Sequence, residues 1–269
     1  AWTERIAELQ RGRYVPQIAR LSDPPRIEDL DGLFLDNRDL EDLRRCRPGK
    51  CGVKLSVLEM TQLRSAAANA ADWKDAVQQA FRAIVLQRAT DYLARGDRDA
   101  PAYYDDPAPV APYATFLELG ESMPLLAQRF PGLCAYLREY PNAHDPHVVR
   151  SFLYWAKEML GGRPIISVTH AAIARYQQPS LPEAVVVSRQ VYATHYKNGA
   201  VTITAISESA TGRHLLYLHR SSLDMIGGIF GGIVRRTIER RLRAEGPRVL
   251  MEFRSRLERA IPLISPSAK

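Results

Sequence analysis

The sequence predicts an α+β protein in which a curved antiparallel sheet lies against one long C-terminal helix. Three observations support this class: alternating segments run from Arg163 to Ser221, an arginine-rich helical stretch follows them directly, and helical patterns fill the first half of the chain. The 269 residues, 46% of them hydrophobic, are enough for a sizeable core. Strands followed by a long helix in this order suggest that function depends on a cavity between sheet and helix rather than on a short sequence motif.

The first hairpin is predicted from Asn198-Gly199, which lies between two alternating segments and is the preferred loop of a type I′ turn. Lys197 would then face Ala200, and opposed residues would share a face of the sheet. The other face would carry Arg189, His195, Thr202, Thr204 and Glu208. The inward, ligand-binding face would carry Tyr192, Thr194, Tyr196, Val201, Ile203 and Ala205.

A second hairpin is predicted through residues 209–212. A four-residue loop there would set Glu208 opposite Arg213 and add Leu216 and Leu218 to the inward face. Upstream, residues 164–175 and 183–188 read as two more strands joined by a proline-containing loop. Residues 152–158 read as one more strand, although residues 148–160 would also serve as a short helix.

The C-terminal helix is predicted to begin at Ser221, because Asp224 follows it at capping-box spacing. Four glycines then lie in its first turns, although each costs about 1 kcal/mol relative to alanine in a helix interior. We therefore expect a portal or hinge formed by Gly227, Gly228, Gly231 and Gly232. The apolar residues beside it would line the cavity, and they are Met225, Ile226, Ile229 and Phe230.

The same helix is strongly basic. Between Arg220 and Arg259 there are ten arginines and five acids, so this segment carries +5 of the formal net charge of +7. A solvated face with mixed charges needs no partner. An amphipathic basic helix also suits transient contact with an anionic membrane surface, through Arg235, Arg236 and Arg240. Nucleic acid is disfavoured, because aromatic residues are not interleaved with the basic stripe.

The first half of the chain is predicted to be helical and to lie outside the sheet. Trp2–Gln10 reads as a short helix, and Ser56 opens another with Glu59 at capping-box spacing. Asp72 would cap a longer helix that ends at Gly96 and carries on one side Trp73, Val77, Phe81, Ile84 and Tyr92. We therefore expect residues 1–130 to elaborate a core formed by residues 131–269.

Cysteine usage bears on the compartment. Cys46 and Cys51 bracket Pro48-Gly49, a preferred central pair of a type II turn, so a small disulfide would close there. A metal site would need further ligands, which do not lie nearby in the sequence. Disulfides persist in oxidising compartments, so we expect a periplasmic or otherwise exported protein whose export signal has been removed. The sequence has no apolar run long enough to span a bilayer.

The predicted sheet and terminal helix resemble the helix-grip domains of the START and polyketide-cyclase-like (SRPBCC) superfamily. The chain also contains the blocks Ser22-Asp-Pro-Pro-Arg, Cys46-Arg-Pro-Gly-Lys-Cys-Gly-Val-Lys-Leu, Phe152-Leu-Tyr-Trp-Ala-Lys-Glu, Ile166-Ser-Val-Thr-His, Ser188-Arg-Gln-Val-Tyr-Ala-Thr-His-Tyr and Leu216-Tyr-Leu-His-Arg-Ser. Through these blocks most of the chain resembles a family of uncharacterised bacterial proteins judged to be exported, a family that implies no particular activity.

These features favour a non-enzymatic carrier or sensor of a hydrophobic, lipid-like molecule, without cofactor or metal. A rival interpretation is an enzyme of the same fold, as cyclases and dehydratases of the superfamily imply, with His170 and His195 as an acid-base set. Histidines on strands are more often structural, and no nucleophile-base spacing is visible. His144 and His147 have a spacing that a metal would accept but lie in a predicted turn. A third interpretation is a module that docks an envelope protein.

Overall fold

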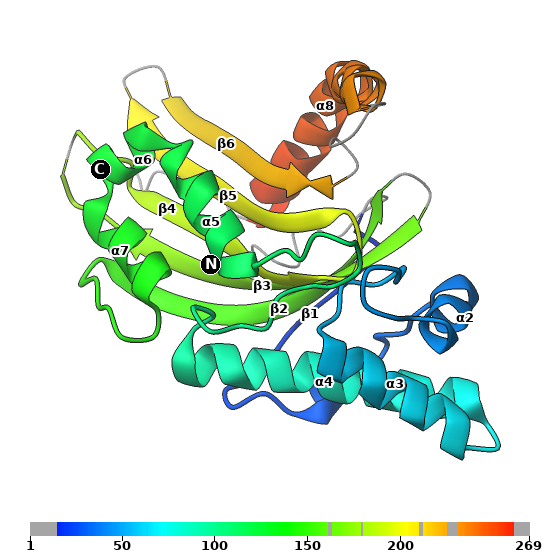
Figure 1. Ribbon diagram of the computed structural model, residues 1–269. Coiled ribbons are helices and arrows are strands. Elements are labelled where there is room, and N and C mark those ends of the chain that lie inside the picture. Colours follow the sequence, from blue (N-terminus) through cyan, green and yellow to red (C-terminus); the bar gives the residue numbers. More distant parts are fainter. Residues whose placement is uncertain (1–14, 161–162, 179, 210–211, 225–230, 261–269) are drawn as a thin grey trace.

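The computed structural model describes residues 15–160, 163–178, 180–209, 212–224 and 231–260. These residues form an α+β protein built on one six-stranded antiparallel sheet, in which the strands follow one another in sequence order (Figure 1). The strands are β1 (Gln17–Arg20), β2 (Val148–Leu160), β3 (Arg163–Arg175), β4 (Ala184–Ala193), β5 (Lys197–Ser209) and β6 (Gly212–Leu223). The helices within the described residues are α2 (Asn37–Arg44), α3 (Val57–Asn69), α4 (Trp73–Arg95), α5 (Pro112–Glu121), α6 (Pro124–Arg129), α7 (Pro131–Glu139) and α8 (Gly231–Ala260), with one 3-10 turn (Ile27–Leu30).

The predicted class is confirmed, and the ambiguous segment 148–160 is a strand, β2. The expectation that the N-terminal half lies outside the sheet is wrong at one place. Residues 17–20 form β1, which pairs with β2 so that Ile18 lies opposite Ala156. A four-residue edge strand is too short for its alternation to be distinguished from a loop in the sequence.

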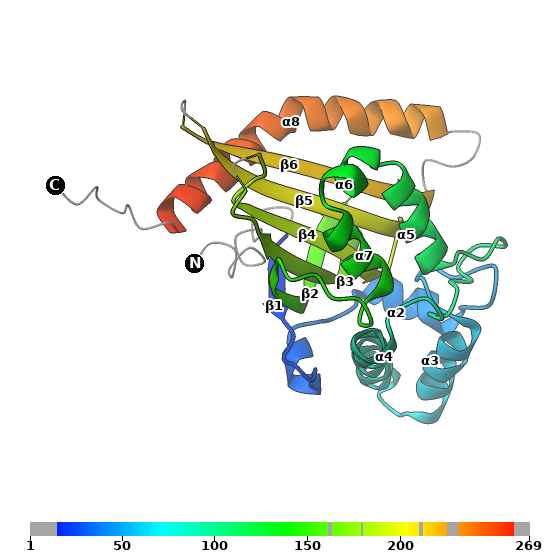
Figure 2. The same ribbon diagram turned by 90° about the vertical axis from the view of Figure 1, so that its left-hand side faces the viewer.

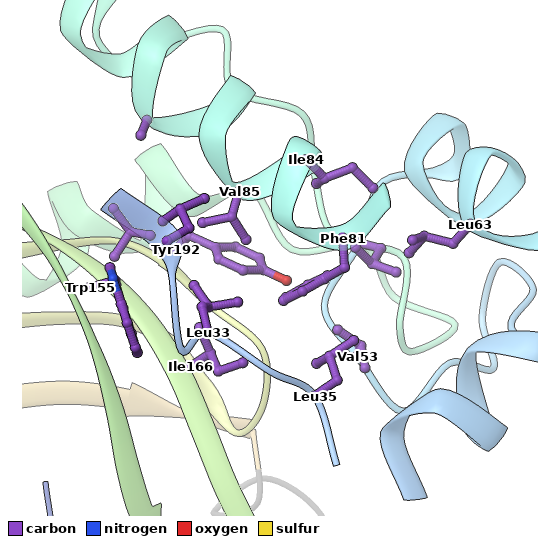
Figure 3. Close-up of a cluster of buried hydrophobic side chains, with 14 of the residues drawn as sticks. Leu33, Leu35, Val53, Leu63, Phe81, Ile84, Val85, Trp155, Ile166 and Tyr192 are labelled. Atoms are coloured by element: carbon purple, nitrogen blue, oxygen red, sulfur yellow. The ribbon is translucent and has the colours of Figure 1, made fainter. Parts of the chain in front are cut away.

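One face of the sheet, which we call the helix-covered face, packs against the N-terminal helices (Figure 1). Near β4 and β5, Val187 and Ile203 form a cluster with Phe116 of α5 and Leu137 of α7. Nearer β1 to β3, the sheet packs against α4 in a second cluster that Figure 3 shows. The residues labelled there are Leu33, Leu35, Val53, Leu63, Phe81, Ile84, Val85, Trp155, Ile166 and Tyr192.

The helix signals of the N-terminal half are confirmed. Ser56 accepts a hydrogen bond from the backbone of Glu59 and opens α3, while Asp72 caps α4. Gly96, with a φ of 73°, ends α4, since a positive φ favours glycine. The predicted helix Trp2–Gln10 lies outside the described residues. Capping signals were reliable here because they depend on contacts within a few residues.

The register predicted from Asn198-Gly199 is wrong. The chain turns at residues 194–196, where Tyr196 has a positive φ of 59°, and both members of the dipeptide lie inside β5. Arg189 therefore lies opposite Val201, on the helix-covered face rather than the other one. Gly199 instead provides space for α5, because a Cβ atom there would lie 3.1 Å from the Thr115 methyl group.

The second hairpin has the predicted register, with Glu208 opposite Arg213. Leu216 and Leu218 consequently share a face with Ala205 and Ile203. The predicted helix start is wrong, because Ser221 lies in β6 opposite Ala200 rather than at a helix cap. The helix α8 includes Gly231 and Gly232 at its beginning, and residues 225–230 lie outside the described part of the chain.

The helix α8 lies along the β6 side of the sheet and reaches the face opposite α5, α6 and α7 (Figure 2). Phe253 marks where it packs, because this side chain contacts an apolar cluster on that opposite face. The helix bends in Figure 2, and Pro247 lies in its interior. Proline removes one backbone hydrogen bond and clashes with the preceding turn, which bends a helix.

Candidate ligand-binding face

The face opposite the helix-covered one is rich in hydroxyl groups, and we call it the hydroxyl face. The alternation of side chains along paired strands puts Tyr154, Thr169, Ser188 and Thr202 on it, one from each of β2 to β5. Tyr154 and Thr169 are opposite each other, as are Ser188 and Thr202. Further hydroxyl-bearing residues on this face include Ser167, Thr204 and Tyr217.

The centre of the hydroxyl face is a hydrogen-bonded network. The Tyr154 hydroxyl hydrogen-bonds with the side chains of Thr169 and Ser188, and burial raises the Tyr154 pKa. All three side chains are buried. Three buried hydroxyl-bearing residues on adjacent strands are unusual for a surface whose only role is to pack a helix, since buried polar groups are costly unless they are hydrogen-bonded.

An ion pair lies at one end of this network. The Lys197 ammonium group pairs with Glu158, and the Ser167 hydroxyl donates a 2.8 Å hydrogen bond to the same carboxylate. Burial would raise the pKa of Glu158, but the adjacent Lys197 and the hydrogen bonds to both partners lower it on balance. The Glu158 carboxylate is therefore charged at neutral pH, and together the two side chains offer both a donor and an acceptor.

The β5–β6 edge of the face is more open. The Thr202 hydroxyl lies 2.8 Å from Nδ1 of His219, and Thr202 also hydrogen-bonds with Tyr217. Tyr217 is 46% exposed. Polar side chains on this face thus extend from buried groups on β2 to β4 to accessible groups on β6.

An apolar cluster adjoins the network on the same face. Phe152, Ala171 and Val186 belong to it, and Phe253 of α8 packs against it together with Val15. Tyr154 belongs to both groups, because its ring lies in the cluster while its hydroxyl joins the network. The hydroxyl face is therefore amphiphilic, with an apolar part and a hydrogen-bonding part.

The helix α8 covers this face incompletely. No described side chain of α8 is buried, and Leu242, on the same stripe as Phe253, is 65% exposed. Leu250, one turn before Phe253, is 50% exposed. The helix therefore contacts the face near Phe253 and leaves much of its own apolar stripe uncovered.

The cavity lining predicted from the sequence is distributed differently in the structure. Val201, Ile203 and Ala205 pack under α5 and α7, so they form core rather than a surface facing α8. Leu216 and Leu218 share their face but are 61% and 39% exposed. The prediction was wrong because alternation shows that a face of a strand is apolar but does not show which helix packs against that face.

The other predicted lining residues have separate positions. Tyr192 is buried in the α4 cluster shown in Figure 3. The Thr194 hydroxyl accepts a 3.0 Å hydrogen bond from the Ile166 backbone, and Tyr196 is half-buried at the turn. Four further predicted residues, and two of the predicted hinge glycines, lie outside the described residues: Met225, Ile226, Ile229, Phe230, Gly227 and Gly228.

The two strand histidines have separate structural partners and do not form one site. Nδ1 of His170 lies 2.8 Å from the Tyr92 hydroxyl, and the centroid of the imidazole lies 4.5 Å from that of the Tyr140 ring. Complete burial, together with the nearby Arg189 charge, lowers the pKa of His170 to about 3. The imidazole is therefore neutral, which suits a structural residue.

His195 belongs to a second buried group. Its Nε2 lies 3.1 Å from Asp39, whose carboxylate also pairs with Arg163. Burial would raise the Asp39 pKa, but hydrogen bonds and charges from His195 and Arg163 lower it on balance. Arg163 also pairs with Asp42 at 3.1 Å, so this group joins α2 to the sheet.

A buried arginine holds the centre of the helix-covered face. The Arg189 guanidinium pairs with Asp97, donates a 2.8 Å hydrogen bond to the Leu137 carbonyl, and lies 3.4 Å from the Phe116 ring centroid. Burial raises the Asp97 pKa, although Arg189 opposes the shift. Asp97 also borders a cleft of about 410 Å³ between α3, α4 and residues 95–101. The charges around this cleft are largely paired, as Glu59 and Arg88 are.

Two local predictions concern cysteines and metals. Cys46 and Cys51 are joined by a disulfide across the tight turn, with Cα atoms 4.5 Å apart. Among the described residues, the carboxylates of Asp105, Asp106 and Asp224 come close enough to hold a metal ion. Lys54 already supplies a cation there, because its buried ammonium lies 2.9 Å from Asp105 and 2.8 Å from Asp224.

Sequence reasoning missed the buried hydroxyl-bearing residues of the central strands. A signal was present, because Ser167 and Thr169 alternate with apolar neighbours, and so do Thr202 and Thr204. Alternation of this kind indicates a polar face on a strand. Only the strand pairing shows that these residues share one face of the sheet with Tyr154.

No family model matches this chain, and no curated protein or solved structure matches it either. None of the helices in the described ranges has the length and apolar character needed to span a membrane.

Proposed function

We propose that the protein binds a small amphiphilic, lipid-like molecule between the hydroxyl face and α8. The observation that carries the proposal is the composition of this face, on which Phe152 and Val186 adjoin a network centred on Tyr154 and Ser188. A binding site of this kind is mostly apolar with a few polar groups that fix orientation. The hydrocarbon part would lie against the apolar cluster, and the polar part would reach the Glu158–Lys197 pair.

The loose packing of α8 supports the same proposal. Leu242 and Leu250 of its apolar stripe are 65% and 50% exposed, while the sheet face beside the helix is hydrogen-bonding in character. An amphiphile between them would cover apolar surface on the helix and would hydrogen-bond with the sheet. Apolar burial contributes about 25 cal/mol per Å², which makes a hydrocarbon chain a suitable occupant.

We also infer a relationship to helix-grip domains and an exported location. The sequential antiparallel sheet, with a terminal helix against one face, supports the first inference. The Cys46–Cys51 disulfide supports the second, because disulfides persist in oxidising compartments.

The first test is native mass spectrometry of protein purified without added ligand. We expect a bound mass that denaturation releases and that lipid extraction identifies as an amphiphile. Protein that is ligand-free and that also fails to bind a fatty acid carrying a nitrobenzoxadiazole fluorophore would contradict the proposal.

The second test locates the site with variants of similar shape. Ser188→Ala and Thr204→Val each remove one hydroxyl from the hydroxyl face, and we expect each to weaken binding of the labelled fatty acid about 2- to 10-fold. The control is Thr115→Val, which removes a buried hydroxyl of α5 beneath the opposite face. An equal loss of affinity in all three variants would show that binding does not occur on the hydroxyl face.

A further inference from the structure

The outward side of α8 carries an exposed row of arginines and apolar residues. Ile238 is the one partly buried side chain among those described from 232 to 244, so it marks the side of this half of the helix that faces the protein. At 3.6 residues per turn, Arg236 and Arg240 lie about 160° from Ile238. Arg243 lies on the same outward side, and all three arginines are exposed.

This outward side continues along the helix at a spacing of three or four residues. We call it the arginine row, and its members are Ile233, Arg236, Arg240, Arg243, Pro247, Met251 and Arg254. Ile233 and Met251 are 63% and 64% exposed, although both are large and apolar. Arg235, which the sequence grouped with Arg236 and Arg240, lies on the other side of the helix by the same geometry.

Two acidic residues of α8 lie on the other side of the helix, whereas Glu239 lies beside the row, three residues after Arg236 and four before Arg243. Glu245 and Glu252 follow Ile238 at intervals of seven, which places them on its side of the helix. There they lie 3.9 Å from Arg248 and 3.7 Å from Arg256. Among the described side chains, the arginine row itself contains cations and apolar groups, and Glu239 is an acidic residue at its margin.

From this arrangement we propose that the arginine row of α8 docks the protein on an anionic phospholipid surface. The arginines match the negative charge of the headgroups, while Ile233 and Met251 enter the boundary between headgroups and acyl chains. A nucleic acid would use the charges but would leave two exposed apolar side chains without a partner. The proposal concerns the outward side of α8 and does not depend on a ligand bound to the hydroxyl face.

The test is flotation of the full chain with vesicles of phosphatidylcholine, with and without phosphatidylglycerol. We expect binding only to vesicles that contain phosphatidylglycerol, and we expect concentrated salt to weaken it, because salt screens exposed charges. The triple variant Arg236→Gln/Arg240→Gln/Arg243→Gln should lower partitioning about 100-fold, at about fivefold for each arginine.

A matched control separates the row from net charge. Arg38→Gln/Arg64→Gln/Arg129→Gln also lowers the formal charge from +7 to +4 and changes only exposed arginines outside α8. We expect this variant to bind vesicles within about twofold of the unmodified chain, because charges beyond the screening length contribute little. An equal loss in both triple variants would overturn the proposal, since binding would then follow net charge alone.

Two further outcomes are decisive. Met251→Ser should weaken the vesicle binding that remains at high salt, because that part comes from apolar insertion. Failure to bind phosphatidylglycerol vesicles, with tight salt-sensitive binding to a DNA duplex, would overturn the proposal in favour of nucleic acid. Vesicle binding by protein that is ligand-free and that also fails to bind the labelled fatty acid would leave the docking proposal standing while contradicting the proposed function.

Discussion

Replacing His170 with glutamine should remove an acid-sensitive contribution to stability. His170 is completely buried, with Tyr92, Tyr136, Tyr140 and Arg189 around it. Its pKa is lowered from 6.5 to about 3, so the folded state keeps the imidazole neutral. In the unfolded chain the same imidazole takes up a proton near its ordinary pKa.

The sign and size of the change in the free energy of unfolding follow from the difference between these two pKa values. Between about pH 6.5 and pH 3 the unfolded chain binds one more proton at this site, so the free energy of unfolding falls as pH falls. The slope is about 1.4 kcal/mol per pH unit, and about 3 kcal/mol is lost between pH 6.5 and pH 4. His170→Gln keeps an acceptor for the Tyr92 hydroxyl but cannot titrate, so this contribution should disappear.

Urea unfolding monitored by circular dichroism, at a series of pH values, measures the effect. We expect the free-energy difference between His170→Gln and the unmodified protein to shift by about 3 kcal/mol across that range in favour of the variant. The control His144→Gln changes an exposed histidine, and its curve should run parallel to that of the unmodified protein. Parallel curves for His170→Gln as well would refute the reasoning, because they would show that the imidazole protonates without unfolding.

Other substitutions test the helix-covered face. Asp97→Asn leaves the buried Arg189 charge without its carboxylate, so the free energy of unfolding should fall by about 3 to 5 kcal/mol in urea. Adding Arg189→Met should recover much of that loss, and a loss below about 1 kcal/mol for the single variant would contradict the ion pair. Gly120→Ala should stabilise α5 by about 0.5 to 1 kcal/mol, since an added Cβ meets nothing within 4 Å. Gly199→Ala should instead lower the melting temperature, because its Cβ would lie 3.1 Å from the Thr115 methyl group, and a stabilising effect would show that α5 does not pack there.

Local signals in the sequence determined much of the secondary structure. Capping residues placed the starts of α3 and α4, and alternation identified the strands after residue 163. The second hairpin had the predicted register because its turn is short and its neighbours pair immediately. These features depend on contacts between residues close in sequence, where propensity and turn geometry act directly.

Features that involve distant segments were not determined in this way. Asn198-Gly199 has the composition of a hairpin turn, yet Gly199 lies in β5 beneath α5. The local preference for a turn yields there to the packing of a helix that lies about 80 residues earlier in the chain. The shift in register is also why Arg189 lies on the buried face with Asp97.

The sequence by itself determined the α+β class, the arginine-rich helix and the alternation of the strands. Only the tertiary structure decided that Val201 and Ile203 belong to the core beneath α5 and α7. It also decided that α8 packs against the opposite face, which carries the hydroxyl groups. The physical reason is that alternation fixes which residues share a face, whereas the element that covers the face depends on the fold of the whole chain. For the same reason the sequence grouped Arg235 with Arg236 and Arg240. Only the partial burial of Ile238 shows which side of α8 faces the protein, and Arg235 does not lie on the outward side with the arginine row.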